Sequence, residues 1–284
     1  MTRALNLLIL LLTFQTDQGS NLGPGVEPQF SPDGLTIAFM RDSQIWIMNI
    51  RTKVESRLPP KGNIHNPSWS PDGNQIVFQS GGTDDVPNFS IYKINKDGTH
   101  FTRLTNADTG SRMSDQRPRW CRDGEHIVWT HGNQIWIMQT DGLNSRPLAS
   151  AAQGGYEYAC DLSPDGRFLA YVRRDDVSED HYRLRILSLG DSSESVFLKD
   201  LTILKARWSN SGNFLYCNTG SQLIKAKVAG NGNPKVVYNF HPVGLEFRSF
   251  DISPDQKLIV YDDSGPERDG NLILDTMGES QIPN

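Results

Sequence analysis

A short polar turn flanked by apolar runs recurs six times along the chain. Its fullest copies read as a bulky apolar residue followed by Ser-Pro-Asp-Gly, and an apolar run follows each copy. The six copies span residues 30–34, 69–73, 120–124, 162–166, 208–212 and 252–256. Their fourth positions are separated by intervals of 39, 51, 42, 46 and 44 residues. Self-similarity at such a period predicts a repeat architecture.

The chemistry of this turn predicts a β-hairpin. Pro presets φ at the second position of a type I turn, Asp accepts hydrogen bonds from nearby backbone, and Gly adopts the left-handed conformation that reverses the chain. A β-branched or aromatic run follows each turn, as in a strand. These second strands are expected at residues 36–39, 75–78, 126–129, 168–171, 213–216 and 258–261.

Each repeat has room for two more strands. Apolar third strands are expected at 44–48, 90–94, 134–138, 184–187, 222–226 and 271–274, and a short fourth strand follows, for example at 101–104. Four strands in about 40 to 45 residues make one propeller blade. The sequence therefore predicts an all-β fold, a six-bladed β-propeller of four-stranded antiparallel blades. The bulky residues that open each copy, Phe30, Trp69, Trp120, Leu162, Trp208 and Ile252, are expected between blades.

The composition gives no indication of a second domain, and we assign residues 21–284 to the propeller. The 284 residues carry a net charge of −5, with 21% charged and 37% hydrophobic residues. A clustered basic footprint is missing, so nucleic-acid binding is disfavoured. The three cysteines, Cys121, Cys160 and Cys217, fall in different repeats without metal-ligand spacing, and we expect small buried thiols.

The amino terminus differs from the repeats. Arg3 precedes an apolar run over residues 4–12, and a polar stretch follows at 15–20. This arrangement predicts a secretory signal over residues 1–20, too short to span a bilayer, and a periplasmic or secreted protein that does not span the membrane. The alternative interpretation is that residues 7–12 form a buried strand that closes the ring.

The repeat resembles that of the TolB family of β-propellers. Residues 66–73, Asn-Pro-Ser-Trp-Ser-Pro-Asp-Gly, are its fullest copy, and the resemblance covers residues 24–282. TolB is a periplasmic adaptor that binds a peptidoglycan-associated lipoprotein over the mouth of its propeller. The resemblance thus implies a non-catalytic, exported protein that binds a protein or peptide, with an envelope lipoprotein as one example. TolB also carries an amino-terminal α/β domain, which we expect this chain to lack.

The last repeat leaves ring closure open. Residues 278–282 are just long enough for a short fourth strand, in which case side-chain packing between the first and last blades would close the ring. Alternatively, residues 20–26 add a strand to the last blade. Repeats five and six also depart from the turn consensus, with Asn210-Ser211-Gly212 in one and Gln256 in place of Gly in the other.

Topology indicates where a binding site would lie. The Ser-Pro-Asp-Gly turns share one face, the turn face, while the connections between blades share the other, the inter-blade-loop face. Polar residues at the start of each first strand would gather there around the channel, where convergent polar groups suit a peptide, an anion or a sugar-like ligand. These channel-mouth residues are Glu27, His65, Asn66, Arg117, Glu157, Tyr158, Lys205 and Arg248.

Catalysis and metal binding have weaker support. The sequence has no Gly-x-Ser-x-Gly or HExxH motif, and we expect no catalytic residue, bound metal or cofactor. Acidic runs at Asp175-Asp176 and Asp262-Asp263 offer oxygen ligands for a structural cation without matching a calcium-loop spacing. The enzymatic alternative is a lyase or hydrolase that acts on a polysaccharide fragment at the channel mouth, where His65 and Glu27 would meet.

Overall fold

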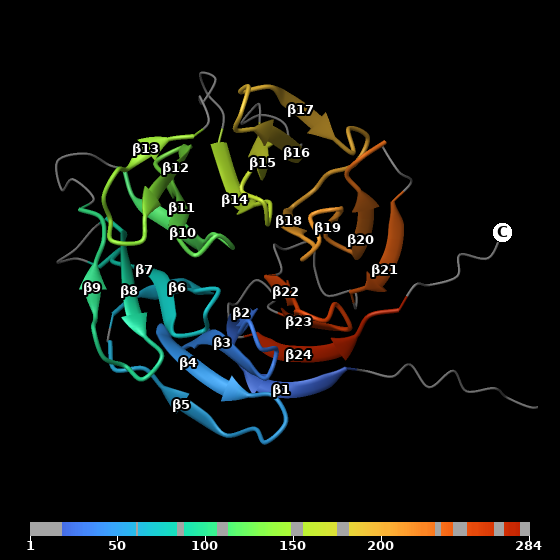
Figure 1. The fold of residues 1–284 in the computed structure, drawn as a ribbon. Helices are drawn as coiled ribbons and strands as arrows, with labels where there is room; N and C mark the ends of the chain where they lie inside the picture. The colour runs from blue at the N-terminus through green and yellow to red at the C-terminus, as the bar shows by residue number, and fades with distance from the viewer. Residues whose placement is uncertain are drawn as a thin grey trace, which may run out of the picture.

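The computed structural model describes residues 19–60, 62–83, 88–106, 113–148, 156–174, 182–230, 234–240, 249–263 and 270–278. Side chains of residues 156 and 158–160 are outside this description. Six separate four-stranded antiparallel sheets are arranged around a central axis, and no helix occurs in the described ranges (Figure 1). The predicted six-bladed propeller is confirmed.

Within each blade, the first strand lies nearest the axis, and the next three follow outward in hydrogen-bonded order. We call the first strands inner strands. They are β2 (Val26–Phe30), β6 (Ile64–Trp69), β10 (Asp115–Trp120), β14 (Tyr156–Leu162), β18 (Lys205–Trp208) and β22 (Phe250–Ile252). Blades 1 to 6 are numbered in this order.

The second and third strands form the largely buried middle of each blade because their apolar side chains face both neighbouring blades. The second strands are β3 (Thr36–Arg41), β7 (Gln75–Ser80), β11 (His126–His131), β15 (Phe168–Arg174), β19 (Phe214–Asn218) and β23 (Leu258–Asp262). The third strands are β4 (Gln44–Asn49), β8 (Ser90–Asn95), β12 (Gln134–Gln139), β16 (Tyr182–Ser188), β20 (Gln222–Lys227) and β24 (Asn271–Thr276).

The outer strands are short and more exposed. They are β5 (Glu55–Arg57), β9 (Thr102–Arg103), β13 (Arg146–Pro147), β17 (Glu194–Phe197), β21 (Lys235–Asn239) and β1 (Ser20–Pro24). The strand predicted at 101–104 is reduced to the two residues of β9, and Phe101, just before it, stacks on Tyr92 with ring centroids 5.2 Å apart.

The Ser-Pro-Asp-Gly turns have the geometry that their residues predict. In the first, the amide of Gly34 donates to the carbonyl oxygen of Ser31 at 2.9 Å, and the Ser31 hydroxyl donates to Asp33 at 2.6 Å. The amide of Leu35 also donates to Asp33 at 2.9 Å. Gly34 has a φ of 70°, in the left-handed region that glycine occupies without strain. These bonds hold the pKa of Asp33 below its ordinary value, chiefly through Ser31.

The bulky residues that open the turns lie between blades, as predicted. Trp208 packs against Ala170 and Val172 of blade 4, and Phe30 packs against Val260 and Leu272 of blade 6. Trp69, Trp120, Leu162 and Ile252 join clusters with the preceding blade in the same way. The core is therefore a ring of inter-blade clusters, with no single centre.

The ring is closed by the amino-terminal strand. β1 pairs antiparallel with β24, with Ser20 opposite Leu274 and Pro24 opposite Asn271, and becomes the outer strand of blade 6. This settles the alternatives for closure in favour of residues 20–24. Residues 279–282, part of the other candidate strand, lie outside the described ranges, as do residues 1–18 of the predicted signal. No helix in the described ranges is long and apolar enough to cross a membrane.

Candidate functional site

The inner strands bear two rows of polar side chains around the axis. One row lies at the strand starts, on the inter-blade-loop face, and contains the channel-mouth residues. The other row lies one residue before each bulky inter-blade residue, closer to the turn face; we call its members the axis residues. They are Gln29, Ser68, Arg119, Asp161, Arg207 and Asp251.

Three channel-mouth residues occupy bulges in their strands. Glu27, Asn66 and Arg117 have φ values of 55°, 53° and 53°, and the pairing register shifts at each position. A non-glycine residue with positive φ is uncommon, so three at equivalent places mark a repeated local structure. The bulges turn their backbone N–H groups away from the strand ladder.

Those N–H groups bind side chains contributed by the blade before. The amide of Glu27 donates to Asp262 Oδ2 at 2.9 Å, that of Asn66 to Glu27 Oε2 at 2.5 Å, and that of Arg117 to Gln79 Oε1 at 2.6 Å. The Asn66 side-chain amide also donates to Gln79, at 3.4 Å. A connected set of hydrogen bonds therefore runs around the mouth from blade 6 through blades 1 and 2 to blade 3.

Glu27 and His65 meet at this mouth. Nδ1 of His65 lies 3.7 Å from Glu27 Oε1, and Nε2 lies 2.8 Å from Asn63 Oδ1. The imidazole also forms a T-shaped contact with the ring of Phe89, with ring centroids 5.9 Å apart. Both side chains are only partly exposed, so the pair is held in place while remaining accessible from the inter-blade-loop face.

Glu157 and Lys205 are placed differently. The Glu157 side chain is buried beside blade 3, where its Oε2 accepts from the amide of Ile135 at 3.4 Å, and Arg173 lies 3.8 Å away. Burial raises the pKa of Glu157 despite these partners. Lys205 Nζ donates to Ser249 Oγ at 2.7 Å, and burial together with Arg207 and Arg119 holds the Lys205 pKa well below its usual range.

Two predicted residues cannot be placed. Tyr158 pairs with Val172 in the β14–β15 register, but its side chain is outside the described part of the structure. Arg248 lies outside the described ranges altogether. Of the remaining channel-mouth residues, Glu27, His65, Asn66 and Arg117 belong to one connected group, whereas Glu157 is turned into the space between blades 3 and 4.

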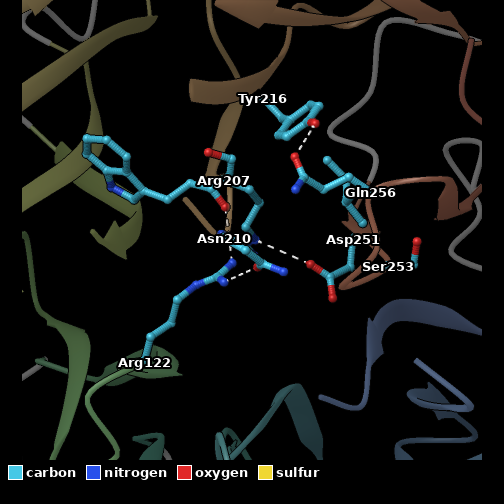
Figure 2. Close-up of a pocket in the computed structure, with 10 residues that line it drawn as sticks. Arg122, Arg207, Asn210, Tyr216, Asp251, Ser253 and Gln256 are labelled. Atoms are coloured by element: carbon cyan, nitrogen blue, oxygen red, sulfur yellow. Dashed lines mark hydrogen bonds and ion pairs between the residues drawn. The ribbon is translucent and has the colours of Figure 1, made fainter. Parts of the chain in front are cut away.

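The four charged axis residues, Arg119, Asp161, Arg207 and Asp251, form an ionic cluster that crosses the centre of the propeller. Arg119 Nε lies 3.2 Å from Asp161 Oδ1, and Arg119 NH2 lies 3.8 Å from Asp251 Oδ1, on the blade across the ring. Arg207 Nε also approaches Asp251 Oδ1, at 3.9 Å (Figure 2). Burial opposes ionisation of Asp161, but Arg119 and Arg207 outweigh it and lower the pKa.

Sequence reasoning missed this cluster, although a signal was present. When the six turns are aligned, the position before the bulky residue holds Arg119, Asp161, Arg207 and Asp251 in four successive repeats. Alternating charge at an inner-strand position predicts pairing near the axis. Asp161 Oδ2 and Asp251 Oδ2 each also accept a backbone amide of the next blade, from Trp208 and Phe30, both at 2.9 Å.

Comparison with known proteins decides the family. A family model described as the TolB beta propeller domain matches residues 19–216, which runs from β1 into blade 5. The chain belongs to the TolB β-propeller family.

Individual relatives of this TolB-family chain are distant. It is 30% identical over 162 residues to the uncharacterized protein Atu1656 of Agrobacterium fabrum, covering 51% of this chain and 53% of that one. It is 29% identical over 117 residues to the uncharacterized peptidase YuxL of Bacillus subtilis, covering 37% of this chain and 17% of the peptidase. The chain thus matches about half of one relative's length and a smaller share of the other's.

Solved structures share the fold at low sequence identity. TolB from Acinetobacter baumannii has a TM-score of 0.56 at 18% identity, covering 90% of this chain and 56% of that one. A putative TolB from Agrobacterium tumefaciens has a TM-score of 0.62 at 14% identity, covering 90% of both. An oligogalacturonate lyase in complex with manganese also has a TM-score of 0.62 at 14% identity, covering 91% of this chain and 78% of that one.

The described residues of this TolB-family propeller offer few groups for a metal or for thiol chemistry. They contain no group of three or more His, Cys, Asp or Glu side chains arranged to hold an ion. Asp262 is buried and accepts the Glu27 amide, and Asp263 accepts the amide of Asn271 at 2.5 Å, so both acidic residues bond to backbone. Asp175 and Asp176 lie outside the described ranges. Cys121 and Cys217 are buried free thiols, as predicted.

Proposed function

We propose that this TolB-family propeller is a non-catalytic, exported protein that binds a protein or peptide partner on its inter-blade-loop face. The hydrogen-bonded group of Asp262, Glu27, Asn66, Gln79 and Arg117 carries the proposal. Glu27, Asn66 and Arg117 present acidic, amide and basic groups along an arc over blades 1 to 3, while the buried Asp262 and Gln79 accept the backbone amides of Glu27 and Arg117. A spread of mixed polar groups suits an extended partner better than a single small molecule.

Rigidity of this arc supports the proposal. The backbone amides of Glu27, Asn66 and Arg117 are fixed by bonds between blades, so their positions do not depend on a partner. Binding to a preformed surface avoids the entropic cost of ordering loops. The Arg117 side chain is exposed beside the buried Gln79, which places a cation at the rim of the arc.

Family membership supports a protein partner, and the predicted signal over residues 1–20 supports export to the periplasm or beyond. An envelope lipoprotein is the partner class that the TolB resemblance suggests. β1 spans Ser20–Pro24, so removal of residues 1–20 would take only its first residue and leave most of the closing strand of blade 6.

A second candidate, a polysaccharide lyase, has one observation in its favour. The fold resembles that of an oligogalacturonate lyase in complex with manganese, with a TM-score of 0.62. The accessible Glu27–His65 pair would supply an acid–base couple for such chemistry. Incubation with oligogalacturonate and Mn²⁺ tests it directly, because a lyase generates an unsaturated uronate that absorbs ultraviolet light.

The binding proposal is tested by charge reversal on opposite faces. Arg117→Glu changes the arc, and Arg51→Glu makes the same change at an exposed position on the turn between β4 and β5. Immobilised wild type and both variants are exposed to envelope extract, and retained proteins are identified by mass spectrometry. We expect a partner that wild type and Arg51→Glu retain and Arg117→Glu loses. Equal retention by all three proteins would remove the arc from the binding surface.

A further inference from the structure

The departures from the turn consensus meet at one pocket on the turn face. Arg122 replaces Pro in the turn of blade 3, Asn210 replaces Pro in blade 5, and Gln256 replaces Gly in blade 6. All three line the same pocket, with Arg207, Tyr216 and Asp251 (Figure 2). Residues far apart in sequence that break a repeat at a common point suggest a function specific to this chain.

Some neighbouring turns pack against each other. A Cβ placed on Gly73 would lie 3.5 Å from Pro32 of the preceding turn, and one on Gly212 would lie 3.5 Å from Pro164. A Cβ placed on Gly124, in the turn that holds Arg122, or on Gly166, in the next turn, would have no heavy atom within 4 Å. The ring of turns is therefore more open on both sides of the Arg122 turn.

Arg122 extends past blade 4 to blade 5. Its NH2 donates to the carbonyl oxygen of Trp208 at 3.1 Å, and its NH1 donates to Asn210 Oδ1. Asn210 in turn donates to the carbonyl oxygen of Pro254 at 2.5 Å. A guanidinium has five N–H donors, so these two bonds leave three for another acceptor.

Gln256 adds donors on the other side of the pocket. Its Oε1 accepts the Tyr216 hydroxyl at 2.8 Å, which directs its amide group in the orientation drawn in Figure 2. The amide nitrogen, with two N–H groups, makes no hydrogen bond to another described residue. Gln256 also holds a φ of 61°, a conformation that glycine occupies more easily, so its side chain is retained at a conformational cost.

The side chains that line the pocket carry a net positive charge, although the whole chain is acidic. Among the lining residues, Arg122 and Arg207 are the cations and Asp251 is the carboxylate. Two guanidinium groups against one carboxylate leave an excess of one positive charge. An anion would restore the balance.

We propose that this pocket binds the carboxylate group of a peptide, either a C-terminal carboxylate or an Asp or Glu side chain, presented to the turn face. Guanidinium groups pair with carboxylates through two parallel N–H···O bonds, which the remaining Arg122 donors permit. The cavity of about 20 Å³ admits a group the size of a carboxylate oxygen, while the rest of the carboxylate and the peptide lie outside it. The site is separate from the arc on the opposite face and does not depend on the function proposed for it.

Three small peptides test the proposal by NMR titration of the Gly166 and Gly212 amides. Acetyl-Gly-Gly has a free carboxylate, acetyl-Gly-Gly-amide lacks it, and acetyl-Asp-amide carries it on a side chain. We expect saturable shifts with at least one carboxylate peptide and none with acetyl-Gly-Gly-amide; comparison of the two acids identifies which source the pocket prefers. Equal binding of the amide, or no binding of either acid, would overturn the proposal.

The matched variants are Arg122→Pro and Arg167→Gln. Arg122→Pro restores the consensus turn, and no described hydrogen bond uses the Arg122 backbone N–H, so the fold is expected to be retained. Loss of a charged hydrogen-bond donor should weaken carboxylate binding by about tenfold or more. Arg167→Gln removes a cation from the same face outside the pocket and should leave binding within about twofold. If Arg122→Pro does not fold, Arg122→Gln replaces it; unchanged affinity in a folded Arg122 variant contradicts the proposal.

Discussion

Leu22 provides a direct test of how the ring is closed. It is the buried side chain of β1, 8% exposed, and packs with Phe30 and Phe39 of blade 1 and Leu272 of blade 6. Leu22→Ala removes this contact while leaving the β1–β24 backbone bonds possible. Leu→Ala substitutions in cores cost about 2–5 kcal/mol. Because β1 is an outer strand and Leu22 keeps some exposure, we expect about 2–3 kcal/mol of lost unfolding free energy.

Urea unfolding measures this loss, with Val54→Ala as the control. Val54 is 70% exposed near the outer strand of blade 1, so its truncation should change the unfolding free energy by no more than about 0.5 kcal/mol. Hydrogen exchange adds a local measurement, since the β24 amides that bond to β1 should exchange faster in Leu22→Ala than in Val54→Ala. If the two variants are equally stable and β24 stays protected, β1 does not carry the closure.

Three further predictions follow from individual residues. Gly34→Ala should lower the unfolding free energy, measured in urea, by about 1–2 kcal/mol, because Gly34 has a φ of 70° and a Cβ there would lie 3.2 Å from Pro254. The control is Gly190→Ala, where a Cβ meets nothing within 4 Å, and it should lower the unfolding free energy by less. Equal losses in the two variants would refute the reasoning. The pKa of Asp161 is lowered in the folded state, so its stabilisation is present above the unfolded value of about 3.9 and is lost as pH falls through the folded value. Wild type should therefore lose more unfolding free energy than Asp161→Asn between about pH 5 and about pH 3, and parallel losses would contradict this. Burial raises the pKa of the Cys217 thiol, so peptide mapping should find it unmodified by a thiol reagent in native protein and modified in urea; rapid native labelling would disagree with its placement.

The architecture was predictable because the information for each blade is local. A turn whose Ser, Asp and Gly bond within five residues specifies one hairpin, and six copies specify six blades. The inter-blade position of Trp208 followed from its place before the turn. The short outer strands were harder to predict, since a strand of two residues, such as Thr102–Arg103, has no hydrophobic periodicity to detect.

Closure of the ring and the sites depend on contacts between distant residues. Nothing in residues 20–24 distinguishes a strand of blade 6 from a leading loop until β24 is found with an open edge. The Glu27–His65 contact was predicted from their places at the starts of two neighbouring inner strands, and the structure brings them within 3.7 Å. Glu157 lies one residue earlier relative to its turn than His65 does, at the position that Ile64 and Asp115 occupy in their blades, and all three are buried. Alternation along a strand therefore turns its carboxylate between blades, where Arg173 and the Ile135 amide meet it.

The Arg119–Asp251 contact has a consequence for the relation between the two ends of the propeller. Because these side chains approach each other across the axis from blades 3 and 6, charged groups separate the two ends of the propeller there. The two proposed sites lie on opposite sides of this contact, so we expect a partner bound at one end to leave the other end sterically unobstructed.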